Sequence, residues 1–350
     1  AALAAAHAAD DDDEHDALYA LDARGTRLNE RNSSAGHARL AHEHVEAEGD
    51  DDYEIVVLSE STRFRAGFAD TQGPRPTMED AMVVYGCFRE RADEDLFAVF
   101  DGHGGDAASE LCSDELPDVL EHLLDDIDAA ARGAARDDAV CDALRRAFVR
   151  VHEMIVEPDR DIECGSTALA CLVSGARAYV ANVGDSRAVL ALRDGGVRRV
   201  THDHKATDED EIALVKQRGG FVARGRVMGT IAISRALGDK ELAHVLGQEP
   251  DVFQFDVADA DLLVLACDGV WDVLSDEEAV AVCRSTRNAR KAAVRLRDLS
   301  LSRNSRDNIS VLVVQLSDAR PVGYERAADS DDDDDSSGDG GGGSGGRLFS

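Results

Sequence analysis

The stretch TALACLVSGARAYVANVGDSRAVLAL, residues 167–192, decides the class of fold. It contains three apolar runs of the length and composition typical of strands, at residues 167–173, 178–183 and 187–192. The connections between them, 174–177 and 184–186, are too short for a helical crossover. The sequence therefore predicts that the three strands form an antiparallel meander and not βαβ units.

Similar apolar runs lie on both sides of this stretch, at residues 80–88, 95–100, 261–267 and 309–316. Helical patterns occur at residues 107–124, 137–156, 208–217, 276–285 and 288–299. In the second of these, apolar residues recur at steps of three and four from Val140 to Ile155, which builds one apolar face. This succession of elements predicts an α+β fold in which helices cover layers of antiparallel sheet.

The charge of the chain excludes some classes of partner. Its 350 residues include 38 Lys or Arg and 71 Asp or Glu, a formal charge of −33. Nucleic acid and an anionic membrane surface both need clustered cations, so neither is expected as a partner. The segments 1–55, with 15 acidic and 4 basic residues, and 326–350, with 7 and 2, are especially acidic. We expect both to be disordered around a domain at 56–325.

The seven cysteines form no CxxC pair, and several lie inside apolar runs. They are expected to be buried, reduced thiols, not a disulfide framework or a zinc site. No apolar run approaches the roughly 20 residues that span a bilayer. The first residues lack the basic region of a secretory signal. Reduced cysteines suit the cytoplasm and the nucleus equally, so we expect one of these compartments. We also expect a monomer.

Several acidic residues stand where an apolar strand begins or ends: Glu79, Asp80, Asp101, Asp185, Asp268 and Asp307. Carboxylates gathered at one end of a sheet repel one another unless cations neutralise them. Oxygen ligands with few His or Cys residues nearby suit magnesium or manganese better than zinc. The pattern indicates a site for a hard divalent cation.

The segment FDGHGG, residues 100–105, adds two features. Its glycines let the backbone approach an ion closely, so Gly102 is a candidate ligand through its carbonyl oxygen. His103 lies two residues from Asp101 and is able to donate a proton to a leaving group. A capping or solvent-facing histidine before the helix near residue 107 explains this spacing equally well.

Eight stretches resemble, in the same order, the metal-dependent protein serine/threonine phosphatases of the type 2C class. They are RPTMED (75–80), FDGHGG (100–105), GSTA (165–168), NVGDSR (182–187), DHK (203–205), SRALGD (234–239), CDGVWD (267–272) and DN (307–308). Eight matches in register make a specific signal. The resemblance covers roughly residues 60–317. It implies a four-layer αββα sandwich, with two packed antiparallel β-sheets flanked by helices.

The resemblance also implies a metal centre of two magnesium or manganese ions. Asp101 would bridge the two ions. Glu79 and the carbonyl of Gly102 would bind one of them, and Asp268 and Asp307 would bind the other.

Further roles follow from the same resemblance. Asp80 would support the site through metal-bound water, and Asp185, together with Asp268, would hold a weaker third ion. Arg75 would bind the substrate phosphate, and His103 would be the general acid. Two more motif residues, Thr167 and Asn308, would support the site.

The implied reaction is hydrolysis of phosphoserine and phosphothreonine in proteins. Two divalent ions activate a water, an arginine fork grips two phosphate oxygens, and a protonated histidine assists a poor alkoxide leaving group. A catalytically weak phosphoprotein-binding regulator and a two-metal nuclease are the alternatives. The complete set of carboxylates argues against the first and the acidic surface against the second. A phosphatase module of a larger signalling protein remains open.

Three positions depart from the family's usual residues. Ala206 stands where Pro is common, Met228 where Asn is usual, and Asn304 where Gly is common. None of them is a proposed ligand. We expect them to affect loop geometry and substrate selection and to leave the metal chemistry intact.

Overall fold

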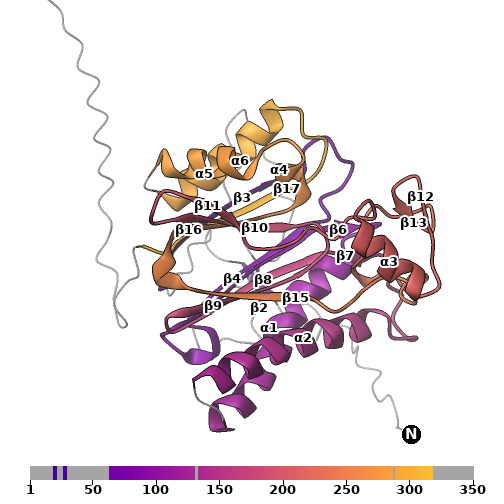
Figure 1. The fold of residues 1–350 in the computed structure, drawn as a ribbon, viewed down its shortest axis with the longest axis horizontal. Coiled ribbons are helices and arrows are strands. Elements are labelled where there is room, and N and C mark those ends of the chain that lie inside the picture. Colours follow the sequence, from indigo (N-terminus) through magenta and orange to yellow (C-terminus); the bar gives the residue numbers. More distant parts are fainter. Residues whose placement is uncertain (1–18, 22–26, 30–62, 131–132, 287, 318–350) are drawn as a thin grey trace, which may run out of the picture.

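The computed structural model describes residues 19–21, 27–29, 63–130, 133–286 and 288–317. Two five-stranded sheets pack face to face (Figure 1). The first has the order β15-β9-β8-β5-β4, and its strands are β4 (Ala81–Gly86), β5 (Glu94–Phe100), β8 (Ala168–Ser174), β9 (Arg177–Val183) and β15 (Asp251–Asp256). The second has the order β11-β10-β16-β17-β3, and its strands are β3 (Arg65–Thr71), β10 (Arg187–Leu192), β11 (Val197–Arg199), β16 (Ala260–Ala266) and β17 (Ile309–Gln315). Every pairing within them is antiparallel.

The strands read as continuous apolar runs because most of them are buried on both faces. In β4, Val83 and Tyr85 belong to the core under the helices, whereas Met82 and Val84 belong to the core between the two sheets. Side chains of a strand alternate between its faces, so one strand serves two cores.

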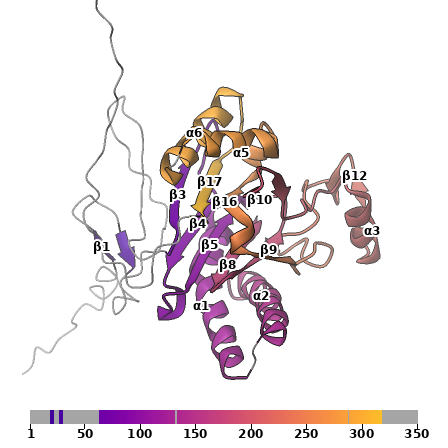
Figure 2. The same ribbon diagram turned by 60° about the vertical axis from the view of Figure 1, so that its left-hand side comes forward.

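Helices cover the two outer faces (Figures 1 and 2). The first sheet is covered by α1 (Ala107–Ala130) and α2 (Ala134–Ile155), and the second by α4 (Asp268–Trp271), α5 (Asp276–Arg284) and α6 (Ala289–Ser302). The apolar face expected for α2 is buried from Val140 to Ile155. A capping box between Ser275 and Glu278 starts α5. The expectation of an α+β, four-layer αββα sandwich is confirmed.

The expected three-stranded meander is wrong in its last strand. β8 and β9 pair as predicted, but β10 belongs to the second sheet, where it pairs with β11 and β16. Gly184 has a φ of 101°, and this backbone redirects the chain from one sheet to the other. A short connection keeps two strands close without requiring them to hydrogen-bond. Because both sheets are apolar on both faces, the pattern does not separate the two arrangements.

Two smaller units lie beside the sandwich. Helix α3 (Glu209–Gln217) and strands β12 (Val222–Ala223) and β13 (Arg226–Val227) project to one side in Figure 2. The other unit is a three-stranded sheet of β14 (Leu237–Gly238), β7 (Gly165–Ser166) and β6 (Gly102–His103). This small sheet lies directly beside the candidate site, because it contains Gly102 and His103.

Part of the acidic N-terminal segment has regular structure. Strands β1 (Tyr19–Leu21) and β2 (Arg27–Asn29) pair antiparallel inside the segment 1–55, where the sequence indicated disorder. The other residues of that segment, and the tail 326–350, lie outside the described residues.

The seven cysteines are all free, as expected. Five of them are buried, whereas Cys87 and Cys141 are partly exposed. Among the described helices, none is long and apolar enough to cross a membrane.

Candidate active site

The candidate ligands of the first sheet lie at one end of it. β5 ends at Phe100, which pairs with Ala81 at the start of β4. Asp101 directly follows β5 and Asp80 directly precedes β4, so the register places both at the same end. The carboxylate of Asp80 is buried and accepts a hydrogen bond from Ser310 Oγ at 2.7 Å, which ties it to the second sheet.

The second sheet brings its carboxylates to the same end. Ala266, the last residue of β16, pairs with Arg187 of β10 and with Val311 of β17. Three carboxylates lie just beyond these strand ends: Asp185, Asp268 and Asp307. The antiparallel register therefore gathers residues that are more than a hundred positions apart in the chain.

These carboxylates influence one another strongly. Burial, followed by the charges of Asp80 and Asp268, raises the pKa of Asp101 well above its usual range. Burial and the charge of Asp185 raise the pKa of Asp268 in the same way. Burial raises the pKa of Asp185 to about 6, although the nearby Lys205 lowers it. Crowded carboxylates favour a divalent cation, and donors that are all oxygen fit Mg²⁺ or Mn²⁺.

Two side-chain cations lie among the carboxylates. Arg75 donates to Asp307 at 2.7 Å, and Lys205 Nζ lies 3.7 Å from Asp185 and 3.1 Å from Asp272. Across the part of the chain that the structure describes, no three His, Cys, Asp or Glu side chains form a group able to hold a metal ion. The oxygen donors suit a divalent cation by their chemistry, but in this arrangement the described side chains are not grouped around an ion, and Arg75 and Lys205 neutralise part of the cluster. Lys205 and Asp272 were not singled out from the sequence, although each lies in a motif that resembles the family.

Asn308 holds the loop that carries Arg75. Its Oδ1 accepts a hydrogen bond from the backbone N–H of Glu79 at 2.9 Å, and its Nδ2 donates to the carbonyls of Gln72 and Thr77 at 2.8 and 2.9 Å. Only 5% of Asn308 is exposed. The side chain therefore fixes the loop 72–79 against the start of β17, next to Asp307.

The backbone around Asp101 is fixed just as closely. A Cβ atom on Gly102 would collide with the carbonyl oxygen of Glu79, so only glycine fits there. Thr167 Oγ1 accepts a hydrogen bond from the N–H of Asp101 at 3.1 Å and shares another with Ser186 Oγ at 2.8 Å. Thr167 thus joins the end of β5 to the turn before β10.

His103 has a carboxylate partner that the sequence did not identify. Its Nε2 lies 2.8 Å from Asp239 Oδ2, and its side chain is 31% exposed. The structure thus places His103 in hydrogen-bond contact with a carboxylate, in contrast to the capping or solvent-facing position that its spacing also allowed. Asp239 ends the motif SRALGD, which was noted for its resemblance without a role for the aspartate.

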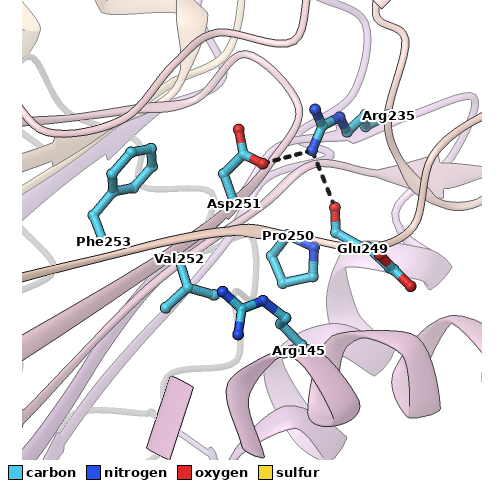
Figure 3. Close-up of a pocket in the computed structure, with 7 residues that line it drawn as sticks. All are labelled: Arg145, Arg235, Glu249, Pro250, Asp251, Val252 and Phe253. Atoms are coloured by element: carbon cyan, nitrogen blue, oxygen red, sulfur yellow. Dashed lines mark hydrogen bonds and ion pairs between the residues drawn. The ribbon is translucent and has the colours of Figure 1, made fainter. Parts of the chain in front are cut away.

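A pocket of about 390 Å³ lies between α2 and the start of β15 (Figure 3). Its lining residues are Arg145, Arg235, Glu249, Pro250, Asp251, Val252 and Phe253. Arg235 is already neutralised, because it donates to Asp251 at 2.9 Å and to Glu211 at 2.6 Å. None of the candidate ligands lines this pocket, so it is separate from the carboxylate cluster.

Comparisons with known proteins agree with this fold. A family model described as Protein phosphatase 2C matches residues 64–309. Protein phosphatase 2C homolog 1 of Schizosaccharomyces pombe is 32% identical over 82% of this chain and 87% of its own length, and its namesake in Saccharomyces cerevisiae is 34% identical over 72% and 94%. The crystal structure of a serine-threonine phosphatase 2C from Toxoplasma gondii is similar, with a TM-score of 0.62 at 25% identity over 72% of this chain and 94% of that one. The chain therefore belongs to the protein phosphatase 2C family and is a protein serine/threonine phosphatase.

Proposed function

We propose that this phosphatase hydrolyses phosphoserine and phosphothreonine with the help of Mg²⁺ or Mn²⁺ held by the carboxylate cluster. The observation that carries the proposal is the crowding of Asp101 and Asp268, whose pKa values are raised by burial and by neighbouring carboxylates. Dependence on these two metals is general in the family. A cluster of this kind gains stability when divalent cations neutralise it.

The ligands in this proposal are those that the resemblance to the type 2C phosphatases implies. Asp101, Glu79, the carbonyl of Gly102, Asp268 and Asp307 would hold the two ions, with Asp101 common to both. When bound, the ions supply an acidified water and neutralise charge on the phosphoryl group.

Two neighbouring carboxylates complete this set. Asp80 supports the ligands from its buried position next to Ser310. Asp185, with Asp268, is a candidate for a weaker third ion, and there a cation must compete with Lys205.

Arg75 binds the substrate phosphate in this proposal. Its side chain is 47% exposed, and its guanidinium donates to Asp307. A phosphate monoester offers two oxygens to the same fork and carries more charge than one carboxylate. We infer that Arg75 exchanges Asp307 for the phosphate, which frees Asp307 to serve as a ligand.

His103 supplies the proton for the leaving group. A serine or threonine alkoxide leaves poorly, so protonation of the ester oxygen as the bond breaks lowers the barrier. The imidazole is partly exposed. Its partner Asp239 directly follows β14 of the small sheet.

The test is turnover of a phosphothreonine peptide by purified protein, with Mn²⁺, with Mg²⁺ and with excess EDTA. We expect activity only with metal, and a loss of about 10²-fold or more in Asp101→Asn. Asp256→Asn is the matched control, because Asp256 is exposed and pairs with Arg177, away from the site. Full turnover in excess EDTA would refute the metal mechanism. Binding of the peptide without turnover would favour the alternative, a catalytically weak phosphoprotein-binding regulator.

A further inference from the structure

We propose that Asp239 is the positioning residue of His103, and that it fixes which ring nitrogen delivers the proton to the leaving group. This inference rests on the proposed role of His103 as the general acid. It also implies that the pair His103–Asp239 matters most for serine and threonine esters, whose alkoxide leaving groups need the proton most.

The pair is produced by the small three-stranded sheet. β6 pairs with β7, and β7 pairs with β14, so that His103 lies opposite Gly165 and Gly165 lies opposite Gly238. Asp239 directly follows Gly238. His103 and Asp239 thus reach each other across the middle strand, 136 positions apart in the chain, with Nε2 and Oδ2 separated by 2.8 Å.

The middle strand leaves room for this contact. A Cβ atom on Gly165 would collide with both Asp239 Oδ2 and His103 Nε2. The backbone of Asp239 is held as well, because its N–H donates to the carbonyl of Cys164 at 3.0 Å. Its φ of 50° is a left-handed value that few residues adopt readily. Its side chain is only 12% exposed. The carboxylate is therefore held in place before any substrate arrives.

The contact determines which nitrogen serves the substrate. If Nε2 keeps its hydrogen and donates it to the carboxylate of Asp239, the proton that leaves the imidazolium comes from Nδ1. As water adds its oxygen to phosphorus and releases one proton to solvent, the P–O ester bond breaks and its electron pair takes the Nδ1 proton. His103 is then neutral, with Nε2–H still bonded to Asp239, and it recovers a proton from solvent.

The value of this arrangement depends on the leaving group. A serine or threonine alkoxide needs the proton most, a tyrosine phenolate less, and para-nitrophenolate least. If the imidazole is no longer held in one orientation, the rate should fall most for phosphoserine and phosphothreonine, less for phosphotyrosine and least for para-nitrophenyl phosphate. A purely structural role of Asp239 would lower all three rates alike.

The test measures kcat on phosphothreonine peptide, phosphotyrosine peptide and para-nitrophenyl phosphate, all with Mn²⁺. Asp239→Gly removes the carboxylate and suits a left-handed backbone. We expect a loss of about 10- to 100-fold on the phosphothreonine peptide and within about threefold on para-nitrophenyl phosphate, with phosphotyrosine between them. Asp239→Asn, which keeps an acceptor oxygen and also tolerates this backbone, should retain part of the rate and decides the question if the glycine variant does not fold.

Two further variants separate this inference from the proposed function. Gly165→Ala keeps every polar group but pushes the pair apart, so we expect the same order of losses as for Asp239→Gly. In the His103→Ala background, Asp239→Gly should cause little further loss. Equal losses of His103→Ala on all substrates would refute the general acid itself. A loss ordered by leaving group in His103→Ala, together with equal losses in the folded Asp239 variants, would overturn only the role of Asp239.

Discussion

Met228 adopts a backbone conformation that suits its side chain poorly. Its φ is 49°, and Asn304 has a φ of 63°. These are two of the positions where this chain departs from the residues usual in the family, and Asn or Gly is the usual residue at both. Left-handed backbone is tolerated by Gly and Asn and costs other residues about 1 kcal/mol or more. The left-handed backbone therefore explains why the family usually has Asn or Gly at these two positions, and the sequence alone did not reveal this backbone.

We expect Met228→Asn to raise the free energy of unfolding by about 0.5–1 kcal/mol, because relief of the strained φ exceeds the loss of a partly buried side chain. Urea unfolding followed by circular dichroism measures the change. Arg226→Asn in the neighbouring strand β13, where the residue is exposed, is the control and should change little. A less stable Met228→Asn protein would mean that packing outweighs strain.

Asp95 is a buried acid far from the proposed ligands. It is 1% exposed, and burial raises its pKa to about 7 although the backbone N–H groups of Cys87 and Arg63 donate to it. Its pKa in the unfolded chain is about 3.9, so the folded state binds the proton more tightly. Its contribution to stability is therefore fully present below about pH 4 and is lost as pH rises through 7.

Asp95→Asn removes this titration while keeping an acceptor oxygen for the two N–H groups. The difference in unfolding free energy, wild type minus variant, should fall by roughly 2–4 kcal/mol between pH 4 and pH 8. Denaturant unfolding at several pH values gives this difference and cancels the other titrating groups. A difference that stays constant with pH would show that Asp95 ionises normally.

At the scale of elements, the strands predicted from apolar runs are found because they are buried on both faces. β15 was missed because its burial is mostly partial, as suits the edge of a sheet, and β3 was missed because its run is interrupted by Gly67 and Asp70. The placement of β10 failed for a different reason. Which sheet a strand joins depends on long-range pairing, here with β16, and local pattern carries no information about that.

Asn308 connects two elements of the site, the loop 72–79 and β17. Asn308→Ala would leave the N–H of Glu79 and two loop carbonyls without their partner. We expect a loss of about 2–3 kcal/mol in stability, and a rise of several-fold in KM for the phosphopeptide, because Arg75 is no longer held in place. Steady-state kinetics and urea unfolding measure both effects.

Asn308→Asp is the second variant for this prediction. It keeps the acceptor for Glu79 but sets a carboxylate oxygen against the carbonyls of Gln72 and Thr77, so its losses should be at least as large as those of Asn308→Ala. An unchanged KM in both variants, with stability reduced, would show that Asn308 supports the fold without positioning Arg75.

At the scale of the whole molecule, the sequence indicated which carboxylates gather but not what neutralises them. Five of the six acids lie next to strand ends that the antiparallel register brings together: Asp80, Asp101, Asp185, Asp268 and Asp307. The carboxylate of Glu79 instead accepts a hydrogen bond from Thr77 Oγ1 at 3.1 Å. Lys205 and Asp239 reach the site from the segment between β11 and β15, whose path follows from tertiary packing. The side chains that neutralise the cluster were thus harder to predict than the carboxylates that form it.

The carboxylate cluster should make metal a determinant of the stability of the whole molecule. Without metal, burial and the charges of Asp185, Asp272 and Asp307 oppose ionisation of Asp268, and the free energy needed to keep it ionised or to protonate it opposes folding. We therefore expect Asp268→Asn to raise the unfolding temperature in EDTA by about 2–4 °C per kcal/mol of repulsion relieved, while it abolishes turnover. The free energy of unfolding of the wild type should rise by about 2.7 kcal/mol when Mn²⁺ is present at roughly one hundred times its Kd. That of the variant should rise much less.

Differential scanning calorimetry with EDTA and with Mn²⁺ measures both effects, and Asp256→Asn is the control because its exposed carboxylate should change neither value. A variant that unfolds at a lower temperature than wild type in EDTA would show that Asp268 is held by favourable contacts in the absence of metal. An equal gain from Mn²⁺ in wild type and variant would place the bound ion elsewhere. If repulsion is relieved and the metal response is lost together, the same carboxylate limits the stability of the free enzyme and holds the ion on which its activity depends.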